Sequence, residues 1–166
     1  IIIDMMKGID HLHLHDTVHS DLSAANILLD KSGRVLVTDF GLSCQLDVED
    51  YKNYMVGTPG YYSPEHISES PITPKTDMYC AGLLLYEMLV GKKAVVASTD
   101  RKAVLQNMKK IDFDRIKTTD RKMTQLIRKM LKQALAFNPN RRTASADTMM
   151  YQCYAILKRY NIRYAR

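Results

Sequence analysis

Two short polar segments of this chain combine residue types that can bind a metal ion and accept a proton. The first is loop 19–26, His-Ser-Asp-Leu-Ser-Ala-Ala-Asn, and the second is Asp39-Phe40-Gly41. The Asp39 carboxylate and the Asn26 amide offer oxygen ligands that suit Mg²⁺, because this ion takes few protein ligands and completes its shell with water and phosphate oxygens. Asp21, if it does not bind the metal, can accept a proton from an attacking hydroxyl.

A predicted β-hairpin lies between the two polar segments. The apolar runs 27–29 and 35–37 are separated by the turn-forming sequence Asp-Lys-Ser-Gly. Because a hairpin brings its outer ends together, Asn26 and Asp39 are expected to lie side by side, with Asp21 on the loop just before them. The sequence therefore predicts that three oxygen-bearing side chains converge around one divalent ion.

The remaining sequence predicts a mostly helical domain. Apolar residues recur every three or four positions over 1–15, and segment 76–90 is apolar nearly all round. Residues 41–74 are predicted to form a long loop, and loops of this length are usually functional. Three more helices are expected: about 101–110 capped by Asp100, about 120–136 capped by Thr118 or Thr119, and one from Thr143 or Ser145 to near Tyr160.

The composition fits one folded domain. The chain has 166 residues, of which 46% are hydrophobic, which is enough to bury a core. No apolar run approaches the roughly 20 residues of a membrane-spanning helix and no signal peptide is recognised, so no membrane partner is expected. Three cysteines without a CxxC motif argue against a disulfide framework or a zinc site. We expect an intracellular, cytoplasmic location and leave the nucleus open.

Charge is divided unevenly along the chain. Residues 1–100 carry a net charge of −7, and residues 101–166 carry +13. The basic half could attract acidic or phosphate-rich partners. Its cations alternate with apolar residues at helical spacing, however, so solvated helix faces are the simpler interpretation and nucleic acid is not an expected partner.

Five landmarks in the same order make the chain resemble eukaryotic protein kinases. Loop 19–26 is similar to the catalytic motif H-R-D-L-x-x-x-N, and Asp39-Phe40-Gly41 matches the D-F-G motif. Residues 57–65, Gly-Thr-Pro-Gly-Tyr-Tyr-Ser-Pro-Glu, resemble the family's G-T-x-x-Y-x-A-P-E segment. Asp77 lies near the start of the buried helix, and residues 138–142 resemble the D-P-x-x-R segment before the last helix.

The resemblance implies the fold of a kinase C-terminal lobe over residues 1–166. This fold is α+β but mostly α, a helical bundle with one small β-hairpin and a long activation segment, expected at 39–65. The Gly-rich loop and the strand lysine of the N-terminal β lobe have no counterpart in this sequence. The chain is therefore interpreted as a partial protein kinase domain, either a piece of a longer kinase or a form that lacks the N-terminal lobe.

The resemblance also implies a role for each matching residue. Asp21 would orient and deprotonate the substrate hydroxyl, while Asn26 and Asp39 would hold the magnesium ions that bridge the ATP phosphates. Leu28 would lie beneath the adenine, or alternatively be a plain core leucine. The other implied roles are substrate contact for Ser23 and Thr58, an interior stack of His19 with Phe40 next to Gly41, a hydrogen bond from Asp77 to the backbone of loop 19–26, and a buried ion pair of Glu65 with Arg142.

Ser20 stands where the family has an arginine beside the catalytic Asp. That arginine usually anchors a phosphate in the activation segment, and a serine carries no charge to do so. Phosphorylation of Tyr51 or Tyr54 would therefore lack its usual partner. Tyr51→Phe and Tyr54→Phe are expected to leave the activity of the complete enzyme within a few-fold, and a loss on the order of a hundredfold in a kinase assay would refute this.

Two more serines depart from the family pattern. Ser23 replaces the lysine of serine/threonine kinases and brings the loop closer to the tyrosine-kinase version. Residues 57–61 are similar to the serine/threonine class, although Ser63 later in that segment replaces an alanine. Serine/threonine specificity is favoured, because the peptide site decides which hydroxyl reaches the phosphate.

Two functions remain open from the sequence. The first is the catalytic half of an ATP-dependent protein kinase that phosphorylates Ser or Thr of a protein substrate, with Mg²⁺ as cofactor and a separate N-terminal lobe as partner. The alternative is a kinase-like decoy or scaffold that binds other kinases or their substrates without catalysis. Intact Asp21, Asn26 and Asp39 favour the enzyme, because a binding module has no need of a metal-holding set. Ser20 and Ser23 favour the alternative.

Overall fold

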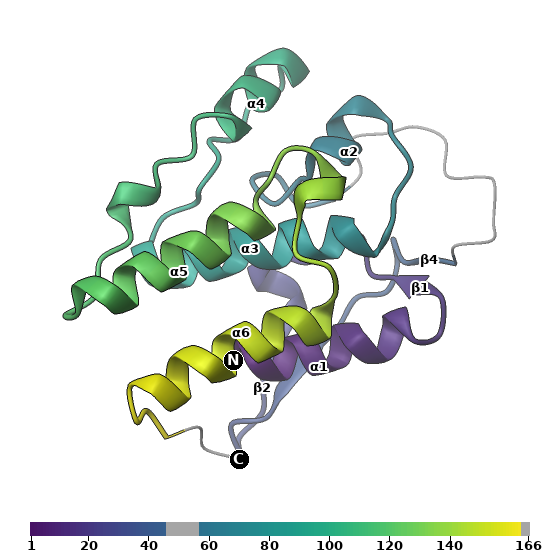
Figure 1. Ribbon diagram of the computed structural model, residues 1–166. Coiled ribbons are helices and arrows are strands. Elements are labelled where there is room, and N and C mark those ends of the chain that lie inside the picture. The colour runs from purple at the N-terminus through teal and green to yellow at the C-terminus, as the bar shows by residue number, and fades with distance from the viewer. Residues whose placement is uncertain (46–56, 164–166) are drawn as a thin grey trace.

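The computed structural model describes residues 1–45 and 57–163 (Figure 1). Its helices are α1 (Ile2–His13), α2 (Pro64–Ser68), α3 (Pro74–Val90), α4 (Arg101–Met108), α5 (Arg121–Ala134) and α6 (Ala146–Arg159), with 3₁₀ turns at Ala24–Asn26, Phe113–Arg115 and Pro139–Arg141. Two antiparallel strand pairs are present, β1 (Thr17–Val18) with β4 (Cys44–Gln45) and β2 (Ile27–Leu29) with β3 (Val35–Val37). The described chain is thus mostly helical with little strand, which is consistent with a kinase-like fold.

Helices α4, α5 and α6 each begin directly after a residue whose side chain caps the helix. The side chain of Asp100 accepts a hydrogen bond from Lys102 N at the start of α4, as predicted, and Ser145 caps α6, which is one of the two predicted alternatives. The cap predicted for α5 was wrong. Asp120 caps this helix by accepting from Met123 N at 2.6 Å, because the Thr118 hydroxyl is used on the Asp120 carbonyl instead.

The predicted long loop 41–74 contains regular structure that the sequence pattern did not indicate. β4 is only two residues long and α2 only five, too short to produce a recognisable period. Helix α2 forms because Pro64 occupies its first turn and Ser63 and His66 make a reciprocal capping box.

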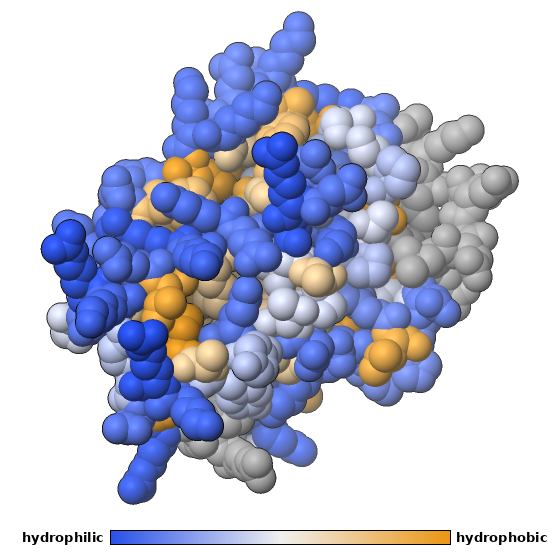
Figure 2. All heavy atoms as spheres, in the orientation of Figure 1, coloured by the Kyte–Doolittle hydropathy of each residue, from blue (hydrophilic) through white to orange (hydrophobic). Residues whose placement is uncertain are grey.

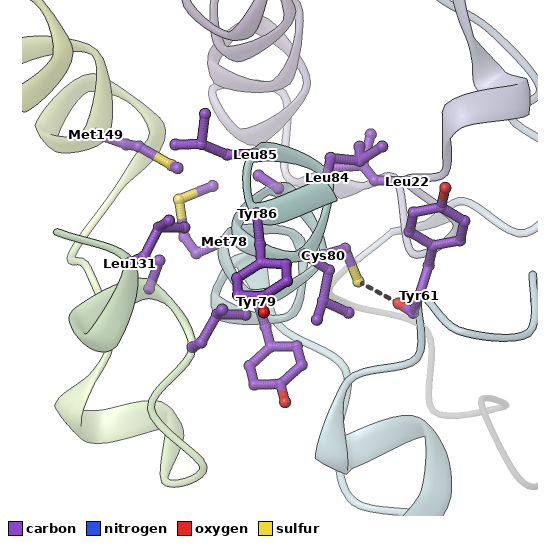
Figure 3. Packing of buried hydrophobic residues seen from close by; sticks show 14 of the residues in the cluster. Leu22, Tyr61, Met78, Tyr79, Cys80, Leu84, Leu85, Tyr86, Leu131 and Met149 are labelled. Atoms are coloured by element: carbon purple, nitrogen blue, oxygen red, sulfur yellow. Dashed lines mark hydrogen bonds between the residues drawn. The ribbon is translucent and has the colours of Figure 1, made fainter. Parts of the chain in front are cut away.

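Helix α3 lies at the centre of the core. Tyr79, Tyr86 and Cys80 from α3 are buried among side chains of the other helices, such as Leu131 of α5 and Met149 of α6 (Figure 3). Helices α1 and α6 lie side by side below α3 in Figure 1. The nearly all-apolar segment 76–90 therefore matches a helix that is covered on most sides.

The outer face of α5 and α6 is largely polar. Figure 2 shows hydrophilic residues over most of this face, with hydrophobic atoms confined to separate patches between them. This agrees with the interpretation of the basic half as solvated helix faces. In the described part of the chain, no helix has both the length and the apolar character needed to span a bilayer.

Candidate active site

Hydrogen bonds to Asp77, near the start of α3, connect loop 19–26 to the core. The Asp77 side chain is fully buried, and its two oxygens accept hydrogen bonds from His19 N and Ser20 N, both at 2.9 Å. The predicted hydrogen bonding between Asp77 and the loop backbone is therefore present, with the carboxylate as acceptor. His13 of α1 adds a third bond, with Nε2 2.8 Å from Asp77 Oδ2. Its spacing of four from the buried Ile9 indicated that His13 faces the core but did not identify Asp77 as its partner.

The hairpin brings the two polar segments together. Ile27 is paired with Val37, and beyond this pair the backbone N–H and the hydroxyl of Thr38 donate to the Asn26 carbonyl at 2.9 and 3.2 Å. Asp39 follows directly. The base of the hairpin thus places residue 39 beside residue 26, as the turn composition predicted.

Asp21 is held by groups from two separate loops. Asn26 Nδ2 donates to the Asp21 carbonyl at 2.9 Å and to Asp21 Oδ2 at 3.1 Å. Thr58 N donates to Asp21 Oδ1 at 2.9 Å. Gly57 permits this approach, because its φ is 128° and an added Cβ would lie 3.3 Å from Asp21 Oδ1. The carboxylate is therefore fixed in orientation between loop 19–26 and loop 57–62.

Asn26 and Asp39 have the free oxygens that a divalent cation requires. The Asn26 amide nitrogen is used on Asp21, which leaves its oxygen available for a metal. The Asp39 side chain is exposed, and Oδ1 accepts only a long 3.3 Å bond from Gly41 N. Within residues 1–45 and 57–163, no Lys or Arg forms an ion pair with Asp21 or Asp39. The donor set and its uncompensated negative charge fit Mg²⁺.

His19 and Phe40 are in contact, but only one of them is interior. His19 is fully buried, its Nε2 donates to the Thr38 carbonyl at 3.0 Å, and its Nδ1 accepts from Asp21 N at 3.3 Å. Its ring centroid lies 5.4 Å from that of Phe40 at an interplanar angle of 54°. Phe40 is 51% exposed, so the expected interior stack was wrong for this residue. Among the described residues, His19 makes the ring contact with Phe40, and this contact leaves about half of the Phe40 surface uncovered.

Leu28 lies on the exposed face of the hairpin. It is paired with Leu36, so both side chains point to the same face, and they are 49% and 46% exposed. On the other face, Ile27, Val35 and Val37 are partly buried against the core, and Val37 lies close to Gly8 of α1. The alternative that Leu28 is a plain core leucine was therefore wrong.

The two predicted substrate contacts differ in accessibility. Ser23 is fully buried, so its side chain offers no surface to a peptide and the predicted substrate contact is not seen. Its hydroxyl has no hydrogen-bond partner within the described residues. A short serine cannot extend outward as the family's lysine does. Thr58 is partly exposed and adjoins the Asp21 carboxylate, a position compatible with substrate contact.

Glu65 and Arg142 form an ion pair that connects α2 to the segment before α6. Arg142 Nη2 lies 2.7 Å from Glu65 Oε1, and both residues are 4% exposed. The guanidinium also donates to the carbonyls of Ala136, Phe137 and Lys75 at 2.7–3.0 Å. This pair therefore anchors the segment that carries loop 57–62.

Tyr61 marks a polar contact that the sequence did not indicate. Its hydroxyl donates to Glu87 of α3, while Lys93 lies 4.5 Å from the ring centroid and donates to the Pro59 carbonyl. Burial and the Glu87 carboxylate raise the pKa of Tyr61 to about 12, so it remains a donor at neutral pH. Tyr51 and Tyr54, discussed above as phosphorylation sites, lie outside the described residues.

Comparisons with known proteins support the resemblance that the sequence motifs indicate. A family model described as the protein kinase domain matches residues 1–154. The serine/threonine-protein kinase PLK4 of Nematostella vectensis is 35% identical over 137 residues, and the serine/threonine-protein kinase SCH9 of Saccharomyces cerevisiae is 33% identical over 147. These matches cover 80% and 88% of this chain but only 14% and 17% of the relatives, so the chain spans less than a fifth of either protein.

Proposed function

Because the chain belongs to the protein kinase family, as the match over residues 1–154 shows, we propose that it is the C-terminal lobe of a kinase that phosphorylates Ser or Thr hydroxyls of proteins. The observation that carries this proposal is the Asp21 carboxylate, which Asn26 and Thr58 hold in one orientation by hydrogen bonds to its two oxygens. Relatives named as serine/threonine kinases, together with the sequence of residues 57–61, support the choice of hydroxyl.

The chain's own residues would act on the substrate side of the transfer. Thr58 and its neighbours would hold the peptide, and Asp21 would orient the hydroxyl and accept its proton as the oxygen attacks the γ-phosphorus. The bond from the γ-phosphorus to the bridging oxygen would break in the same transfer, and ADP would leave. The hydrogen bonds from Asn26 and Thr58 fix the carboxylate in advance, which avoids a reorganisation cost during the reaction. Mg²⁺ bound by Asn26 and Asp39 would supply neutralisation of the phosphate charge.

The exposed hairpin face suits a nucleotide and an N-terminal lobe. Leu28, Leu36 and Phe40 leave about half of their surfaces open on or next to this hairpin. A flat adenine ring would bury part of this surface, and the rest would need a further apolar cover. We therefore include a separate N-terminal lobe in the proposal.

Mg-ATP should bind weakly to the 166-residue chain. Only one side of the nucleotide would contact protein, so much of the contact area of an enclosed ligand site is missing. Isothermal titration calorimetry of this chain is expected to give no binding in the micromolar range, whereas a complete kinase domain containing the same residues should bind. Micromolar binding by the chain alone would contradict the need for an N-terminal lobe.

The same pair of samples separates the enzyme from the alternative scaffold. A complete domain that binds Mg-ATP and transfers phosphate to protein supports the enzyme. A complete domain that neither binds Mg-ATP nor transfers phosphate, while its thermal unfolding remains cooperative, would favour the scaffold.

A further inference from the structure

His66 of α2 connects two of the serines at which the chain departs from its family. Its Nδ1 lies 3.0 Å from both the backbone nitrogen and the hydroxyl of Ser63. Its Nε2 lies 3.1 Å from the hydroxyl of Ser20. All three residues are more than nine-tenths buried. A single imidazole ring therefore joins loop 19–26 to the start of α2.

The direction of these hydrogen bonds follows from the donors that are present. The backbone N–H of Ser63 can only donate, so Nδ1 of His66 must accept. In a neutral imidazole the proton then sits on Nε2, which donates to Ser20 Oγ. Burial lowers the pKa of His66 and favours this neutral form, against a smaller opposing effect of nearby carboxylates, those of Glu65, Asp77 and Asp21.

Ser20 needs such an anchor because of its backbone conformation. Its φ is 67°, in the left-handed region that residues other than glycine seldom adopt. Asp77 holds the Ser20 backbone N–H, and His66 holds the side chain. The next residue is Asp21, so the direction in which its carboxylate leaves the loop depends on how residue 20 is held.

We infer that His66 is a positioning residue whose neutral ring ties loop 19–26 to α2 and thereby fixes Asp21 against loop 57–62. Loop 19–26 is then joined to α2 by the Ser20–His66 bond and to loop 57–62 by the bond from Thr58 N to Asp21 Oδ1. Neither connection involves a phosphate. The inference rests on the proposed function for its catalytic meaning, whereas the connection itself does not depend on it.

The test uses three single variants of the 166-residue chain. Ser20→Ala removes the acceptor of the bond. His66→Asn keeps an oxygen near the position of Nδ1, so it can still cap Ser63, but it is too short to reach Ser20. Ser68→Ala is the matched control, because it removes a 2.8 Å bond to the Pro64 carbonyl within α2 that does not involve loop 19–26.

Amide hydrogen exchange at Thr58 is the measurement, since this N–H donates to Asp21. Ser20→Ala and His66→Asn should each accelerate exchange at Thr58 by about fivefold relative to core amides such as Leu135, the effect of losing one net hydrogen bond. The double variant should exchange no faster than either single variant, because both remove the same bond. Ser68→Ala should leave the ratio unchanged.

Three results would overturn the inference. The first is an unchanged exchange rate at Thr58, relative to core amides, in Ser20→Ala or His66→Asn. The second is a double variant whose acceleration equals the product of the two single accelerations. The third is an equal acceleration in Ser68→Ala. Nitrogen NMR of the unaltered chain gives an independent test that needs no variant to fold. A proton on Nδ1 of His66 would exclude its bond from Ser63 N–H and the donation from a neutral ring to Ser20 that the inference assigns. None of these measurements uses ATP. A failure of the kinase proposal would appear in the binding and phosphate-transfer assays and would leave these results unchanged.

Discussion

Asp21→Asn is expected to lower kcat for phosphoryl transfer by the complete kinase domain by about 10²–10⁴-fold. The asparagine has nearly the same shape but cannot accept a proton from the substrate hydroxyl. It also has one acceptor oxygen where Asp21 uses two, one toward Asn26 and one toward Thr58. One of these donors would therefore face an NH₂ group, and the side chain would lose part of its fixed orientation.

The measurement is steady-state transfer of labelled phosphate to a protein substrate, with thermal unfolding recorded on the same samples. Because Asp21 is not a proposed metal ligand, KM for ATP should change by no more than a few-fold. Asp147→Asn, in the first turn of α6, makes the same chemical change away from loop 19–26 and should leave kcat unaltered. A folded Asp21→Asn domain that keeps kcat within tenfold of the parent would contradict the role of this carboxylate as proton acceptor.

The relation of Asn26 to Asp39 could be predicted because it depends only on local pairing. A turn of suitable composition between two apolar runs fixes the register, and the observed pairing of Ile27 with Val37 places the flanking residues together. Helix α3 could be placed for a similar reason, since its uninterrupted apolar sequence has few other stable environments.

Contacts that arise between distant segments could not be predicted in the same way. The bonds from His13 to Asp77 and from His66 to Ser20 join residues 64 and 46 positions apart, and no periodicity connects such pairs. The exposure of Phe40 and the burial of Ser23 likewise depend on which neighbours cover them. Resemblance to a family supplied roles for Asp77, Phe40 and Ser23 but none for His13 or His66, and it did not give the burial of these side chains.

Arg142→Ala is expected to destabilise the domain by about 3–5 kcal/mol, because removal of one partner leaves the buried Glu65 carboxylate without a counter-charge. The substitution also removes the hydrogen-bond donor of the three backbone carbonyls that the guanidinium binds. Domains of this size have a free energy of unfolding of about 5–15 kcal/mol, so the variant should be close to the limit of folding at 37 °C. Urea unfolding followed by circular dichroism should show a lower midpoint with an unchanged slope.

Arg141 provides a matched control because it is exposed and directly precedes Arg142. Arg141→Ala should change the free energy of unfolding by no more than about 0.5 kcal/mol. Glu65→Gln in the Arg142→Ala background separates the two causes of the loss. If the unpaired Glu65 charge is the main cause, the neutral glutamine should restore part of the free energy of unfolding. The three carbonyls would still lack their donor in this double variant. A further loss in this double variant would show that the carboxylate is not the main source of the destabilisation, and that Arg142 stabilises the fold chiefly through the backbone it binds.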